Sequence, residues 1–214
     1  MLNLREYSET QTLLADYLPW ACLVAPGVVL NKDGSFQTTF RYRGPDLESS
    51  TEEELVSVMA RVNNVLRRFG SGWALFFEAQ RHEVHDYPES DFPDALTWLI
   101  DQERALQAEE SGTRFESAYY LTLLWLPPAD ASGRAEKALI TRAETEDAAS
   151  WRHRLETFQQ QSDRVWDLLD TCLDDVWPLT DDETLTYLHS TISTKRHPVV
   201  TPELPVFLDA ILAD

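Results

Sequence analysis

Apolar side chains recur at heptad spacing over the last third of the chain, from Trp151 to Val176. They step by four and three residues in alternation, with Ser162 as the one polar position. This spacing predicts a long amphipathic helix, which Pro178 would end. The helix could pack over a sheet of its own chain, or its apolar seam could be shared with another subunit. In the second interpretation, the candidate interface residues are Trp151, Leu155, Phe158 and Trp166.

A β-hairpin is predicted near the amino terminus. Between Phe36 and Arg43, aromatic and polar residues alternate, a period of two that is typical of a strand. Gly34 can supply the positive φ that a tight turn needs, so we expect 28–30 to form the first arm. The preceding residues, 20–30, form an extended apolar segment.

Helices and strands alternate through the rest of the chain. Thr51 and Glu54 have the spacing of a capping box, as do Thr180 and Glu183, so a helix is expected to begin at each. Gly70 would end the first of these helices. The other elements expected are a short helix over 7–17, a strand over 73–79, a helix from Asp91 to Leu106, a strand over 118–126, a loop over 128–145 and a closing helix over 205–212.

This order of elements predicts an α+β fold in a single domain over 1–214. We expect a mixed or antiparallel sheet with an N-terminal β-hairpin, helices packed on one face, and one long C-terminal amphipathic helix.

The charge of the chain limits its partners. It has 37 Asp and Glu against 18 Lys and Arg, a formal net charge of −19. Such a surface repels phosphate groups, so we expect neither direct nucleic-acid binding nor adhesion to anionic membranes. Acidic residues are dense over Asp86–Glu116 and Asp163–Glu183. These stretches are either solvated faces or a docking surface for a basic protein segment.

The sequence contains no nucleotide-binding motif. A Walker A loop needs Gly-x-x-x-x-Gly-Lys-Ser/Thr, and none of the three lysines, Lys32, Lys137 and Lys195, follows a glycine. No Gly-x-Ser-x-Gly motif is present either. We therefore expect no catalytic residue and no cofactor in this chain, although an enzyme of an unrecognised type stays open as an alternative.

Few residues have the spacing of metal ligands. His82, His85 and Asp86 form the best such group, but a solvated strand end is the simpler interpretation. Cys22 and Cys172 lie among apolar neighbours, which predicts buried thiols in a reduced, cytoplasmic compartment. The apolar stretches are too short for a membrane span, so none is expected.

Several segments resemble the amino-terminal region of the conjugal-transfer ATPases of the CagE/TrbE/VirB family, which belong to type IV secretion systems. The resemblance covers most of the chain and is densest before Arg81. The segments that carry it are Met1–Tyr7, Leu14–Leu47, Ala60–Arg81 and Ala118–Pro128.

This resemblance implies that the chain is the non-catalytic amino-terminal domain of such an ATPase. In the family, a motor domain with Walker A and Walker B motifs follows, and ATP and Mg²⁺ would belong to that motor. The resemblance also implies a cytoplasmic, peripheral position at the bacterial inner membrane. The domain would dock the motor to inner-membrane subunits, including a small TrbD-like protein, and to neighbouring copies as a homo-oligomer. The alternative is an unrelated cytoplasmic protein-interaction or adaptor domain.

Overall fold

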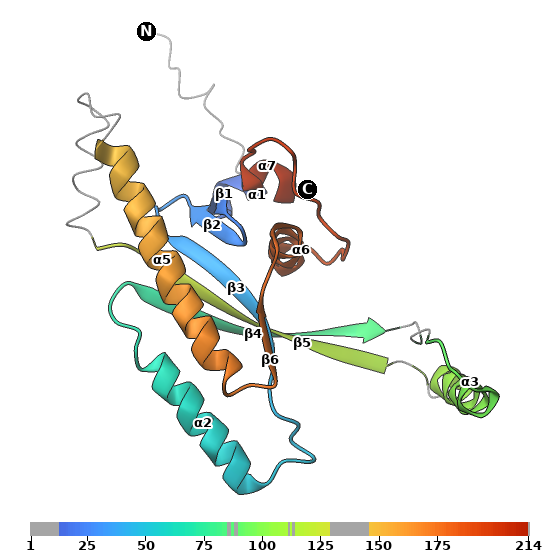
Figure 1. Ribbon diagram of the computed structural model, residues 1–214. Helices are drawn as coiled ribbons and strands as arrows, with labels where there is room; N and C mark the ends of the chain where they lie inside the picture. The colour runs from blue at the N-terminus through green and yellow to red at the C-terminus, as the bar shows by residue number, and fades with distance from the viewer. Residues whose placement is uncertain are drawn as a thin grey trace. The chain divides into compact units, whose positions relative to one another are not determined.

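The chain forms an α+β structure in which one sheet is covered by helices (Figure 1). The computed structural model describes residues 13–84, 87, 90–110, 112, 114–128 and 146–213, without the side chains of 146–149. The described part divides into two compact units, Glu78–Tyr119 and the remainder of the chain. That the two units act as a single domain stays a prediction. The first residues of the helix expected over 7–17 and most of the loop expected over 128–145 lie outside the described residues.

Six strands form the sheet, in the order β1-β2-β3-β5-β4, and β6 also pairs with β3. The strands are β1 (Trp20–Ala25), β2 (Val28–Asn31), β3 (Phe36–Arg43), β4 (Trp73–Val84), β5 (Arg114–Trp125) and β6 (Asp175–Pro178). The predicted hairpin of β2 and β3 is confirmed, with Val28 opposite Thr38. Farther along β3, Phe40 lies opposite Pro178 of β6, so two short antiparallel strands pair with successive halves of β3.

The helices begin where local sequence signals predict. They are α1 (Leu14–Tyr17), α2 (Glu52–Leu66), α3 (Ala95–Glu110), α5 (Glu146–Asp170), α6 (Asp181–Ile192) and α7 (Leu208–Leu212). Both capping boxes are present: the Thr51 N–H donates to Glu54 Oε2 at 2.8 Å, and the Thr180 N–H donates to Glu183 Oε2 at 2.8 Å. The predicted α+β class is therefore confirmed.

Helices cover both faces of the sheet. Leu121 of β5 packs in one apolar cluster with Val65 of α2 and Val165 of α5. The next residue of β5, Thr122, lies on the opposite face, where its hydroxyl is 3.4 Å from the hydroxyl of Tyr187 in α6. The prediction that the helices pack on one face holds for α2 and α5 but not for α6. Because both faces of β5 carry apolar or aromatic residues, both need a cover.

The heptad series does not stay within one helix. α5 ends at Asp170, so the prediction of a helix as far as Val176 is wrong at its end. Cys172 lies in a turn, and Val176 lies in β6. The edge of β3 beyond β2 offers backbone hydrogen bonds, and β6 takes them. The side chains of both residues still join the apolar cluster of Leu169, so the spacing reflected burial rather than a continuous helix.

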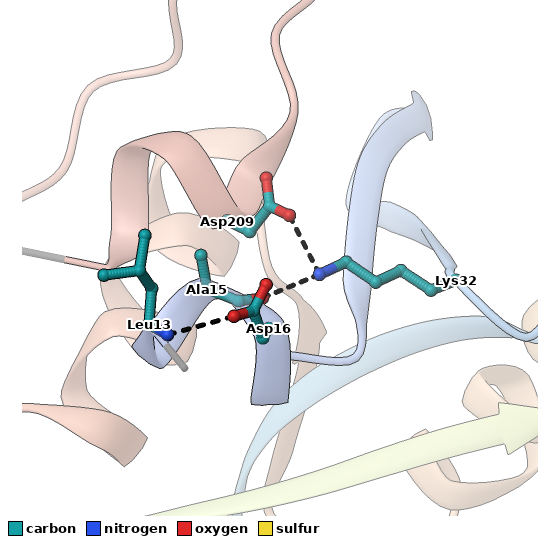
Figure 2. A network of polar contacts seen from close by, with 5 residues as sticks. All are labelled: Leu13, Ala15, Asp16, Lys32 and Asp209. Atoms are coloured by element: carbon teal, nitrogen blue, oxygen red, sulfur yellow. Dashed lines mark hydrogen bonds and ion pairs between the residues drawn. The ribbon is translucent and has the colours of Figure 1, made fainter. Parts of the chain in front are cut away.

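Lys32 connects three short segments of the larger unit (Figure 2). Its Nζ lies 2.8 Å from Asp209 Oδ2 in α7 and donates to the carbonyl oxygen of Ala15 in α1 at 2.8 Å. At the start of α1, the Leu13 N–H donates to Asp16 Oδ2 at 2.9 Å. These contacts hold α1 and α7 beside the turn that precedes β3.

Candidate protein-docking surface

The seam of α5 faces the sheet of its own chain. Leu155 and Phe158, two of the predicted interface residues, are buried. The Phe158 ring stacks on the rings of Phe36 and Trp73, with centroids 5.8 and 5.7 Å away. Of the two interpretations of the seam, the geometry of these residues therefore favours packing on the chain's own sheet.

The two tryptophans of α5 are only partly covered. Trp151 is 40% exposed and Trp166 is 36% exposed. The indole N–H of Trp166 donates to the carbonyl oxygen of Val176 at 2.8 Å, which fixes that ring beside β6. The four predicted interface residues are therefore not brought together on one free surface.

The smaller unit contains strand residues that the sequence did not predict. β4 runs to Val84, beyond the expected end at Ala79, and β5 begins at Arg114 instead of Ala118. The added residues are mostly polar, so their own sequence indicates a loop rather than a strand. Contacts between the two strands compensate, since the Arg81 guanidinium lies 4.5 Å from the centre of the Phe115 ring.

α3 connects β4 to β5 and makes polar contacts at its start and middle (Figure 1). At its start, the N–H and hydroxyl of Thr97 donate to the Asp94 carboxylate at 2.8 and 2.6 Å. These bonds hold the pKa of Asp94 below its ordinary value. In the middle of the helix, the Tyr87 hydroxyl donates to Asp101 Oδ1 at 2.8 Å, which raises the pKa of Tyr87.

No residue of α3 is buried, although the helix carries several large apolar side chains. Its half-covered positions, Asp101, Ala105 and Ala108, recur at steps of four and three and form one side of the helix. The opposite side carries Leu96, Leu99 and Leu106, which are 68%, 58% and 61% exposed. Trp98 and Ile100 are exposed as well.

Two acidic residues lie among the exposed leucines. Counted from Leu96, steps of three and four residues lead in turn to Leu99, Glu103, Leu106 and Glu110. We call these five residues the outward face of α3. The segment Glu78–Tyr119, which includes this face, carries eleven Asp and Glu against three Arg.

The outward face of α3 is the candidate functional site, and sequence reasoning missed it. The periodicity predicted the helix, but whether its apolar residues are covered depends on the rest of the fold. One signal was available: apolar residues at 96, 98, 99 and 100 point around most of the helix, which a single core contact cannot cover.

The other predicted sites show no such arrangement. His82 lies in β4, whereas His85 and Asp86 lie outside the described residues. Among the residues that are described, no three His, Cys, Asp or Glu side chains are grouped as metal ligands. Cys172 is buried as predicted and Cys22 is half-buried; burial raises the pKa of both thiols. No described helix combines the length and the apolar character of a transmembrane segment.

Comparison with known proteins identifies a family. Residues 27–133 match the family described as the amino-terminal domain of the type IV secretion system ATPase VirB4/TrbE. Conjugal transfer protein TrbE of Rhizobium radiobacter is 32% identical over 98% of this chain, and the match spans 27% of that protein.

Two further relatives are similar over shorter stretches. A probable conjugal transfer protein TrbE of Sinorhizobium fredii is 38% identical over 59% of the chain and 87% of its own length. Type IV secretion system protein virB4 of Brucella suis is 27% identical over 62% of the chain and 16% of its own length.

Proposed function

Because the chain belongs to the VirB4/TrbE family of type IV secretion ATPases as its amino-terminal domain, we propose that it is a non-catalytic docking domain. In this proposal it attaches the ATPase motor to inner-membrane subunits of a conjugation machinery and to neighbouring copies of the ATPase. Its place is the cytoplasmic side of the inner membrane, as a peripheral protein.

One observation carries the proposal: a sixteen-residue helix, α3, has large apolar side chains and no buried residue. Exposed apolar side chains grouped on one element mark protein or membrane contact sites more often than scattered ones do. The net charge of −19 disfavours anionic lipids, which leaves protein partners as the better fit.

The absence of catalysis in this chain rests on its sequence. No Walker A motif occurs in the 214 residues, so ATP and Mg²⁺ would be bound by the motor domain of the family. The purified chain should show neither ATP binding in calorimetry nor ATP hydrolysis. Either activity would contradict the proposal that this domain is non-catalytic.

The docking role can be tested by capture from membranes. A tagged chain is mixed with detergent-solubilised inner membranes of cells that carry the conjugation machinery, and a small TrbD-like subunit is detected with an antibody. We expect the chain to capture this subunit, and the double substitution Leu96→Ser and Leu99→Ser to reduce the capture at least about tenfold.

The matched control is Val56→Ser with Met59→Ser, which changes exposed apolar residues of α2 and should leave the capture unchanged. Capture of no subunit of the machinery by the unsubstituted chain would overturn the docking function.

A further inference from the structure

We propose that the outward face of α3 binds a basic amphipathic helix of a partner protein, an inference that rests on the proposed docking function. The face consists of Leu96, Leu99, Glu103, Leu106 and Glu110. Its geometry, its exposure and its charge each restrict what can cover it.

The spacing of the face indicates a helical partner. Steps of three, four, three and four residues keep all five positions on one narrow stripe of the helix. The same spacing is the seam along which two helices pack side by side in coiled coils. Since α3 has 16 residues, it offers a stripe about 24 Å long to a second helix.

The exposure of the face indicates that a cover stabilises α3. An isolated helix of this length is marginal in water, and most helices are stabilised by packing of one apolar face. α3 gains polar contacts at Asp94 and Asp101, yet its leucines stay more than half exposed. A partner that covers Leu96, Leu99 and Leu106 would supply the packing that the described residues do not.

The two glutamates select the charge of the partner. Glu103 and Glu110 occupy seam positions, where a partner helix places its own side chains directly opposite. A Lys or Arg at each opposed position would pair with them, while an apolar or acidic residue there would leave a carboxylate desolvated and unpaired.

The charge also disfavours two other occupants. Two copies that met through this face would bring together two segments with an excess of eight acidic residues each. An anionic membrane surface would be repelled in the same way. A basic helix is attracted by the whole segment and by the two seam glutamates, so it fits this face best.

A pair of designed peptides tests the proposal on the whole chain. Both are fluorescent, helical and 21 residues long, with Leu at the seam positions except two, seven residues apart. These two positions hold Lys in one peptide and Glu in the other. Fluorescence anisotropy should show the Lys peptide binding at least about tenfold more tightly than the Glu peptide, and more weakly as salt rises.

Charge reversal gives the sharpest comparison. Glu103→Lys with Glu110→Lys should exchange the preference, so that this variant binds the Glu peptide more tightly. Leu99→Gln should weaken binding of the Lys peptide about tenfold, and Met59→Gln on α2 should not. All of these residues are exposed, and circular dichroism confirms that each variant is folded.

Several results would overturn the inference. They are no binding of the Lys peptide, equal binding of both peptides, or binding that Leu99→Gln and Met59→Gln weaken equally. Self-association of the chain, or binding to neutral phosphatidylcholine vesicles, would also overturn it if Leu99→Gln abolished that contact. If membrane subunits are still captured while the Lys peptide does not bind, the docking function stands and the basic helix is excluded.

Discussion

At the scale of single residues, the aromatic cluster around Phe158 explains why the seam of α5 is a core element. The rings of Phe36, Trp73 and Trp125 lie within 5.7 to 6.4 Å of the Phe158 ring, centroid to centroid. Stacked aromatic pairs at such distances add to the free energy gained by burying the rings. Trp151 lies on the same helix but keeps 40% of its surface exposed.

This difference predicts unequal costs of truncation. Phe158→Ala should lower the free energy of unfolding by about 3–5 kcal/mol, because it opens a cavity beneath α5. Trp151→Ala should lower it by about 1 kcal/mol or less, since much of that side chain stays in water. Urea denaturation measures both. A small cost for Phe158→Ala together with a smaller oligomer would instead assign the seam to a contact between subunits.

At the scale of elements, signals between residues close in sequence were reliable. The capping boxes at Thr51 and Thr180 and the hairpin of β2 and β3 form where the sequence places them. Each depends on residues a few positions apart. β6 was missed because its backbone partner, β3, lies more than 130 residues earlier in the chain. The exposure of α3 was missed for the same reason, since it depends on which other segments approach the helix.

The start of α3 should respond to acid. Hydrogen bonds from the Thr97 hydroxyl and N–H hold the pKa of Asp94 below its ordinary value of 3.8. A lowered pKa in the folded state means that the carboxylate stabilises the helix start above pH 3.8. This contribution is lost as the pH falls through the lowered pKa of the folded state.

We therefore expect the amide signal of Thr97 in NMR spectra to stay constant from pH 7 to about 5 and to shift below about pH 4. Asp94→Asn is the matched variant, because Asn can still accept the hydrogen bond but does not titrate. The shift should be much smaller in this variant. An equal shift in both proteins would show that the transition reports another group.

At the scale of the whole molecule, charge connects the stability of the chain with the binding proposed for it. With 37 acidic and 18 basic residues, the folded chain repels itself, and unfolding moves the charges apart. The segment Glu78–Tyr119 holds eight of the nineteen excess negative charges in fewer than a quarter of the residues. A basic partner would therefore relieve repulsion in the segment where it is densest.

Salt should substitute for part of that relief. The Debye length falls from about 30 Å at 10 mM to about 8 Å at 150 mM ionic strength, so distant acidic residues cease to repel one another. We expect the Tm in differential scanning calorimetry to rise by a few degrees as NaCl increases from 10 to 150 mM. The variant with Glu103→Lys and Glu110→Lys should show a smaller rise, because each reversal removes two negative charges. A Tm that stays flat or falls with salt would mean that the acidic residues are already compensated within the fold.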